Sequence, residues 1–192
     1  GFDSKHEDFS KIAAQGFDFF HHQPGVYGKI NGTNESGQPL GNFHGTHVIG
    51  ISSAQQNNGK GSIGLSPNCE VIPVQVSDEW SELWPSSVII DAILFSINNG
   101  ARVVNLSLGL PMTKAQWKSL SDTEKDLFIA LSAEQASFWK ELYAYGEELG
   151  VVFIKAAGNS GIPIEFDPMC RSNLPIYVMA TDRENQLAEF SN

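Results

Sequence analysis

The stretch Val-Val-Phe-Ile-Lys-Ala-Ala at residues 151–157 is a short, largely apolar run, and similar runs precede it at residues 70–76 and 102–108. Runs of this length, rich in valine and isoleucine, are typical of strands buried on both faces of a parallel sheet. A shorter run at residues 176–180 predicts a fourth strand. Together these segments indicate a sheet whose strands are mostly parallel.

Helical patterns lie between the predicted strands. Apolar residues recur every three or four positions in residues 86–97, where we expect Ser86 to cap a helix and Gly100 to end it. Before the third strand, large apolar side chains recur with a period near seven: Leu127, Leu131, Phe138, Leu142 and Leu149. Gly150 stands where this second helix should end. Alternating strands and helices with right-handed crossovers predict a three-layer α/β fold, with helices on both faces of the sheet.

Length and composition bound the organisation of the chain. With 192 residues and 41% hydrophobic content, the chain is long enough for one compact core, and we expect a single domain. Ser121 and Glu124 fit a capping box, so residues 111–135 are predicted to be a helical insertion. The chain opens on Gly1 without a methionine and closes on Phe190-Ser191-Asn192. We therefore expect it to be incomplete at both ends.

The net charge of −10, from 22 acidic and 12 basic residues, argues against nucleic acids and anionic lipids as partners. No apolar run is long enough to span a bilayer, and the amino terminus has no signal-peptide pattern. The two cysteines, Cys69 and Cys170, exclude a disulfide framework. Whether they form one bridge depends on their separation in space, which the sequence leaves open.

The motif His-Gly-Thr-His-Val-Ile-Gly at residues 44–50 places a histidine at the start of an apolar helix. Gly45 and Thr46 put little bulk beside the imidazole of His44, as suits a base that is exposed yet held. A lone histidine is more often structural, so the assignment of His44 depends on the motifs that follow it in the chain.

Asn159 directly follows the predicted strand at residues 151–157. It therefore lies at the carboxyl end of a strand, where open α/β sheets place ligand sites, and its amide can donate to developing negative charge. A turn asparagine beside Gly158 and Gly161 is the alternative. The segment Gly-Asn-Ser-Gly also suggests Ser160 as a nucleophile of the chymotrypsin type. We reject that assignment, because those enzymes are antiparallel β barrels.

Three ordered motifs, at residues 44–50, 103–109 (Val-Val-Asn-Leu-Ser-Leu-Gly) and 156–161 (Ala-Ala-Gly-Asn-Ser-Gly), resemble those of the subtilisin-like serine proteases, the subtilase family or peptidase family S8. The resemblance covers nearly the whole chain. It implies a serine endopeptidase that works through an acyl-enzyme, with His44 as general base and Asn159 as oxyanion donor. It also implies polypeptide substrates, secretion, a possible propeptide outside the given sequence, and no cofactor for the chemistry.

Further residue roles follow from the resemblance. Two facing segments should line the pocket for the residue before the scissile bond: Ser107, Leu108 and Gly109 on one side, Ala157 and Gly158 on the other. The other substrate edge should lie at residues 81–85, where Glu82, Leu83 and Trp84 stand in place of the usual small residues. Asp8 is expected either to bind a structural calcium ion with loop residues 56–61 or to be a solvated carboxylate.

Two family motifs are missing from these 192 residues: the Asp-Ser/Thr-Gly turn and the Gly-Thr-Ser-Met-Ala helix start. Gly1 resembles the glycine of the first turn, and Phe190-Ser191-Asn192 resembles the segment before the catalytic serine. Asp3 is not taken as the triad acid, because Lys5 stands where that turn needs glycine. The chain alone is thus expected to be inactive. The alternative is a non-catalytic pseudoprotease or peptide-binding domain.

Overall fold

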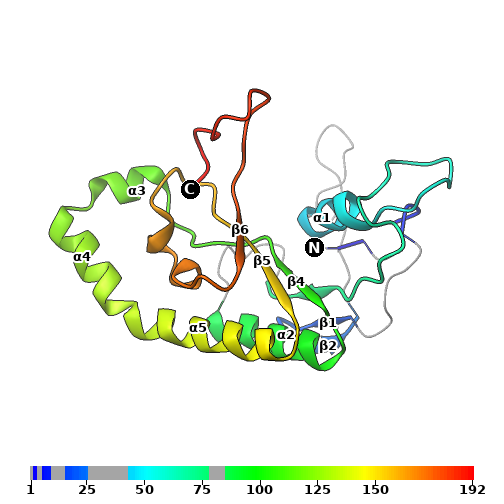
Figure 1. The fold of residues 1–192 in the computed structure, drawn as a ribbon, viewed down its shortest axis with the longest axis horizontal. Helices are drawn as coiled ribbons and strands as arrows, with labels where there is room; N and C mark the ends of the chain where they lie inside the picture. Colours follow the sequence, from blue (N-terminus) through cyan, green and yellow to red (C-terminus); the bar gives the residue numbers. More distant parts are fainter. Residues whose placement is uncertain (1, 4–5, 10–15, 26–42, 78–84) are drawn as a thin grey trace. The chain divides into compact units, whose positions relative to one another are not determined.

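The structure, a computed structural model, describes residues 2–3, 6–9, 16–25, 43–77 and 85–192 (Figure 1). Contacts divide the chain into two compact units, Gly1–Asn99 and Gly100–Asn192. Each unit is described by itself, and the single domain expected from the chain length stays a prediction. Among the described residues, no helix combines the length and the apolar character needed to cross a membrane.

The first unit contains a small sheet with the strand order β2-β1-β3. In it β1 (Phe17–Asp18) pairs antiparallel with β2 (Gln23–Pro24) and parallel with β3 (Val74–Gln75). The strand β3 is shorter than the predicted strand at residues 70–76. Pro73 directly precedes β3 and has no N–H for a ladder hydrogen bond, although its carbonyl accepts one from Phe17.

The helices of the first unit are α1 (His44–Ser53) and α2 (Ser86–Asn98). The side chains that α2 buries follow the predicted helical spacing: Ile89, Ala92, Ile93, Ser96 and Ile97. Phe95 packs its ring against Phe17 and Phe19, with centroid distances of 5.8 and 5.4 Å. Gly100 follows α2 with a φ of +84°, as expected of a residue that ends a helix. The predicted cap is wrong: Pro85 is the N-cap and Ser86 is the first helical residue.

The second unit is built on a parallel sheet with the strand order β4-β5-β6. Its strands are β4 (Val103–Leu106), β5 (Val152–Ala156) and β6 (Ile176–Val178). Helices and short 3₁₀ turns connect them: α3 (Lys114–Ser119), α4 (Asp122–Leu131), α5 (Ala133–Glu148), η1 (Ile164–Phe166) and η2 (Pro168–Cys170). This alternation confirms the α/β class and the parallel strands.

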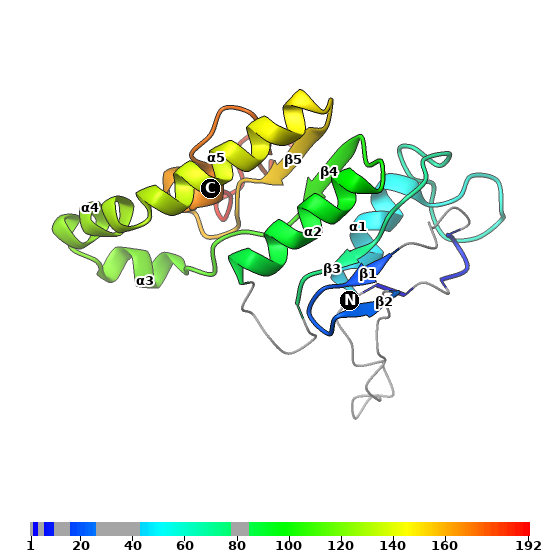
Figure 2. The ribbon, with the colours of Figure 1, turned by 90° about the horizontal axis from the view of Figure 1, so that it is seen from below.

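Helix α5 lies along one face of this sheet (Figure 2). The Tyr143 ring packs 5.0 Å from the Phe153 ring, and the Tyr143 hydroxyl donates to the Met169 carbonyl at 3.2 Å. The strands alternate, so that Val104 and Phe153 are buried while Val103 is exposed. The expectation of burial on both strand faces is therefore wrong for this unit, because α5 covers one face. The second helical layer stays a prediction, since α2 belongs to the other unit.

Residues 111–135, predicted to be a helical insertion, contain the helices α3 and α4, so their helical character is confirmed. That they form an insertion stays a prediction. Each of the two helices begins with a capping box, Thr113 with Gln116 and Ser121 with Glu124. The helix predicted before the third strand is α5, but the period-seven stripe is not its buried face, because α4 ends at Leu131 and a new helix begins at Ala133. The buried face of α5 consists of Ala136, Trp139, Leu142, Tyr143 and Gly146. Of the predicted stripe, only Leu142 belongs to this face, and the other members are exposed: Leu127, Leu131, Phe138 and Leu149.

The two cysteines differ in chemistry, and both are free thiols. Cys69 is exposed and Cys170 is buried. Burial, followed by the nearby charge of Asp167, raises the pKa of Cys170 to about 12. We therefore expect iodoacetamide at pH 8 to modify Cys69 in the native protein and to modify Cys170 only after denaturation. Peptide mass mapping locates the modified thiol, and rapid native modification of Cys170 would contradict the described core.

Candidate active site

The carboxyl ends of β4 and β5 lie side by side. The two strands pair in parallel, with Val103 opposite Val152 and Leu106 opposite Lys155. The segments that follow them, Ser107–Gly109 and Ala157–Gly158, therefore meet at the same edge of the sheet. A Cβ built on Gly109 would lie 3.8 Å from the Cα of Gly158. The structure thus brings together the two segments that the sequence assigns to substrate binding.

The turn between β5 and Asn159 depends on Gly158. Its φ of +116° is a backbone conformation that residues with a side chain rarely adopt, and a Cβ there would overlap the Asn192 carboxamide. The Oδ1 atom of Asn192 accepts hydrogen bonds from the N–H groups of Ser160 and Ile162, at 3.0 and 3.2 Å. The Asn192 N–H donates to the Gly158 carbonyl at 3.1 Å. The loop that carries Asn159 is therefore held by Asn192.

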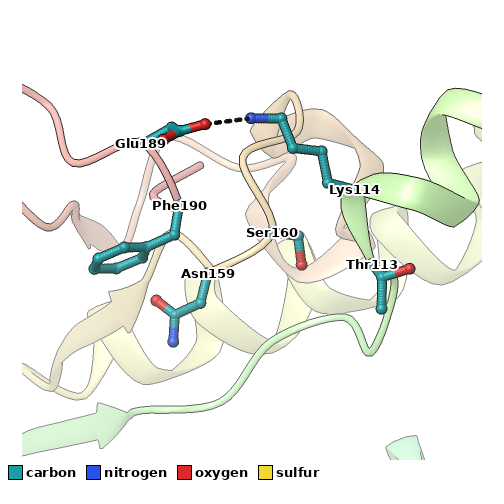
Figure 3. Close-up of a pocket in the computed structure, with 6 residues that line it drawn as sticks. All are labelled: Thr113, Lys114, Asn159, Ser160, Glu189 and Phe190. Carbon is teal, nitrogen blue, oxygen red and sulfur yellow. Dashed lines mark ion pairs between the residues drawn. The ribbon is translucent and has the colours of Figure 1, made fainter.

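Asn159 is exposed and lines a cavity of about 390 Å³. The cavity is drawn in Figure 3 with its lining residues: Thr113, Lys114, Asn159, Ser160, Glu189 and Phe190. Among the described residues, none makes a hydrogen bond with the Asn159 carboxamide. The segment at residues 111–135 contributes Thr113 and Lys114 to this cavity, and Lys114 Nζ lies 3.8 Å from Glu189 Oε1.

The hydroxyl of Ser160 donates to the main-chain carbonyl of Met112. The sequence of the second unit contains no histidine, so this unit supplies no imidazole base for the hydroxyl. Both observations agree with the rejection of Ser160 as a nucleophile. The bond to Met112 also ties the start of the segment at residues 111–135 to the Asn159 loop.

His44 is the first residue of α1 and is exposed. The main-chain N–H of Asp3 donates to Thr46 Oγ1 at 2.8 Å, so the amino-terminal segment lies beside the histidine motif. His44 and Asn159 belong to different units. Their approach to a common substrate is therefore a prediction. Of the other predicted substrate edge, at residues 81–85, only Pro85 lies within the described residues.

Asp8 joins the amino-terminal segment to the loop after α1. Its side chain is buried; Oδ1 accepts from Asn58 Nδ2 at 2.7 Å and Oδ2 accepts from the Ser62 N–H at 3.0 Å. The predicted alternative of a solvated carboxylate therefore does not describe Asp8. Instead, the carboxylate anchors the loop.

Calcium prefers about six to eight oxygen ligands. Asn58 turns its amide nitrogen, rather than its oxygen, toward Asp8, and its Oδ1 accepts from the Lys60 N–H at 2.9 Å. In the part of the chain that the structure describes, no group of three or more His, Cys, Asp or Glu residues is placed to hold a metal ion. The binding of a structural calcium ion by Asp8 therefore stays a prediction.

The structure also shows an ion pair that the sequence reasoning missed. Lys155 is completely buried in β5, and Asp167 is 5% exposed. Lys155 Nζ donates to Asp167 Oδ2 at 3.0 Å and to the carbonyls of Leu108 and Ala156 at 2.7 and 2.9 Å. The signal was a lysine inside the apolar run at residues 151–157, because a buried ammonium requires a partner.

Comparisons with known proteins agree with this arrangement. The profile of a family described as "Subtilase family" matches residues 1–192. The chain is 31% identical over 192 residues to the thermophilic serine proteinase of Bacillus sp. strain AK1, a match that covers 100% of this chain and 39% of that protein. It is 32% identical over 152 residues to the minor extracellular protease Epr of Bacillus subtilis, a match that covers 78% of this chain and 20% of that protein.

Solved structures give the same result. A structure of proteases from Pseudoalteromonas arctica superposes with a TM-score of 0.70 at 25% identity, covering 100% of this chain and 57% of that chain. The chain thus spans less than two thirds of the length of each of these relatives.

The hydrogen bonds of Asp8 predict an acid-dependent stability. Those from Asn58 and then Ser62 lower the pKa of Asp8 in the folded state. Because the folded pKa lies below the unfolded one, the stabilisation is complete above the unfolded value, about 3.9, and is lost as the pH falls through the folded pKa. We expect Asp8→Asn to lower the thermal midpoint at pH 7, and the deficit to shrink on acidification.

Thermal melts of the parent and Asp8→Asn, followed by circular dichroism between pH 2 and pH 7, provide the measurement. Asp126→Asn, on the exposed side of α4, is the matched control and should leave the midpoint nearly unchanged. A deficit of the same size at every pH would show that the charge of Asp8 contributes nothing.

Proposed function

The chain belongs to the subtilase family, and from this we propose that the protein containing it is a serine endopeptidase that hydrolyses peptide bonds through an acyl-enzyme. The observation that carries the proposal is the position of Asn159. Its carboxamide is exposed at the carboxyl end of β5, on a cavity and beside the two segments assigned to substrate binding.

Asn159 is proposed to stabilise the oxyanion of the tetrahedral intermediate. The carboxamide can donate an N–H to the negative charge that develops on the carbonyl oxygen of the scissile bond. The backbone of the loop that carries this carboxamide is already held by Asn192 and by the Ser160–Met112 bond, which supports a fixed starting point for the donor side chain. Preorganised donors contribute because they need little rearrangement when the charge appears.

His44 is proposed to act as the general base toward a serine and then as the general acid toward the leaving amine. An aspartate orients the imidazole in this scheme. In the proposed scheme this aspartate and the serine belong to the complete polypeptide, since neither of their motifs occurs in residues 1–192. The hydrogen bond from Asp3 to Thr46 supports the proposal by holding the amino-terminal segment close to the histidine motif, and the one from Ser160 to Asn192 holds the carboxyl-terminal segment close to the asparagine motif.

The substrate is proposed to be an extended polypeptide that lies along Ser107–Gly109 and Ala157–Gly158. An extended peptide forms main-chain hydrogen bonds with exposed backbone, which small residues leave accessible. Secretion is proposed as well, and the named extracellular relative supports it. The pocket beside Asn159 lies where Thr113 and Lys114 can contact the same polypeptide.

We expect His44→Ala to abolish hydrolysis of peptide substrates by the complete polypeptide that contains this chain. Asn159→Ala should lower kcat by about 10²–10³-fold with little change in KM. This magnitude is the one known for loss of the asparagine oxyanion donor in a subtilisin. His47→Ala is the matched control, since His47 is exposed on the same helix. Steady-state kinetics with a fluorogenic peptide measure all three variants. Full activity in His44→Ala would overturn the assignment.

We also expect residues 1–192 alone to hydrolyse no peptide, since neither the Asp-Ser/Thr-Gly nor the Gly-Thr-Ser motif occurs in them. A serine-directed fluorophosphonate should label the complete polypeptide and leave the 192-residue chain unlabelled. Peptide binding without labelling of the complete polypeptide would favour the second candidate, a non-catalytic peptide-binding relative. The absence of both motifs from these residues is the observation that keeps this candidate.

A further inference from the structure

We propose that Lys155 is a positioning residue that fixes the spacing of the two substrate-binding segments and so sets the preference for the residue before the scissile bond. The inference rests on the proposed function. Lys155 is 0% exposed, so it cannot touch a substrate and is not a catalytic residue. Its effect must pass through the groups to which it is hydrogen-bonded.

Those groups belong to both sides of the substrate-binding edge. The Leu108 carbonyl, which accepts from Lys155 Nζ at 2.7 Å, lies in the segment after β4. The Ala156 carbonyl, which accepts at 2.9 Å, lies at the end of β5, just before the segment Ala157–Gly158. The last paired residues of β4 and β5 are Leu106 and Lys155, so the strand ladder does not join the backbone beyond them. There, one ammonium group bridges the two stretches of backbone.

The third donor of the ammonium is directed to Asp167 Oδ2 at 3.0 Å. Asp167 is itself fixed, because its Oδ1 atom accepts from the Met169 N–H at 2.9 Å within η2. All three N–H groups of Lys155 thus have partners, which a buried ammonium requires. The bridge is therefore anchored by η2.

The ion pair lies directly next to Gly109. A Cβ built on Gly109 would lie 3.8 Å from Lys155 Nζ, from Asp167 Oδ2 and from the Cα of Gly158. A shift of the ammonium would therefore move the backbone on which a substrate side chain rests. Replacing a buried ion pair by apolar residues is often neutral for stability, so stability alone gives little reason for this pair.

The test uses the complete polypeptide and two variants. Lys155→Met with Asp167→Asn removes the bridge and both charges together, so no orphaned buried charge remains. Asp167→Asn alone is the matched control. It removes the counter-charge but retains Lys155 Nζ, which can still donate to the carboxamide oxygen introduced by this substitution and to the carbonyls of Leu108 and Ala156. The comparison therefore separates loss of the charge partner from loss of the carbonyl bonds.

The probes are peptides whose scissile amide is replaced by a reduced –CH₂–NH– bond. In one series only the residue before this bond varies, from Ala to Leu to Phe. In a second series only the residue two positions after the bond varies. Calorimetric titration gives the affinities, and melting curves confirm that each variant is folded at the assay temperature.

We expect the Phe-to-Ala affinity ratio of the first series to change by about tenfold in the double variant and by less than about twofold in Asp167→Asn, with the second series unchanged in both. Equal changes in both series, or no change in either, would show a merely structural role and overturn the inference. A full shift in Asp167→Asn would overturn it too, because the carbonyl bonds would not be the cause.

Lys155→Gln with Asp167→Asn is the second variant, in case the double variant with Met does not fold. Glutamine keeps two N–H donors, so a smaller shift in the same direction is expected. Failure of this conservative pair to fold would count against the inference, since the ion pair would then serve the fold of the unit. If the parent binds these peptides but hydrolyses no unmodified peptide, the endopeptidase proposal fails and the ratios still decide the role of Lys155. If the parent binds none, both fail.

Discussion

The parallel pairing of β4 with β5 is the constraint on which the site in the second unit depends. Strands that run in the same direction end at the same edge of a sheet, and the register from Val103–Val152 to Leu106–Lys155 aligns their ends. Residues 107–109 and 157–158, remote in sequence, thereby become neighbours. The intervening helices α3, α4 and α5 provide the long connection that a parallel pair requires. The helices of residues 111–135 lie within this connection, and the strand ends stay aligned.

Beyond the ends of these strands, side chains replace the ladder in holding the backbone. The ammonium of Lys155 bridges the Leu108 and Ala156 carbonyls, and the carboxamide of Asn192 accepts from the Ser160 and Ile162 N–H groups. Substrate-binding backbone has to leave some of its own hydrogen-bonding groups for the ligand. Side-chain bonds of this kind can hold such a segment while other main-chain groups stay available.

Local chemistry explains which parts of the fold could be predicted from the sequence. Gly100 and Gly150 end helices at φ values of +84° and +77°, and the capping box of Ser121 and Glu124 forms as expected, because these signals act within one turn of the chain. The period-seven stripe was not the buried face of α5, because α4 and α5 are separate helices on either side of Ser132. Tertiary partners could not be predicted either. The sequence shows a lysine in a predicted strand, but only the fold brings Asp167 next to Lys155.

The candidate site residues were predicted for a different reason. They lie in short motifs that can be recognised in the sequence without knowledge of the tertiary contacts, and at Gly158 the φ of +116° shows why one of these motifs contains glycine. The hydrogen bonds that anchor these motifs could not be predicted, because Asp3–Thr46 and Ser160–Asn192 join residues far apart in the chain. In each unit the local backbone conformation of a motif is thus set by neighbouring residues, and its position is held by a hydrogen bond between residues far apart in the chain. A protease mechanism needs the conformation and the fixed position together, because a motif contributes to catalysis only where it is held still.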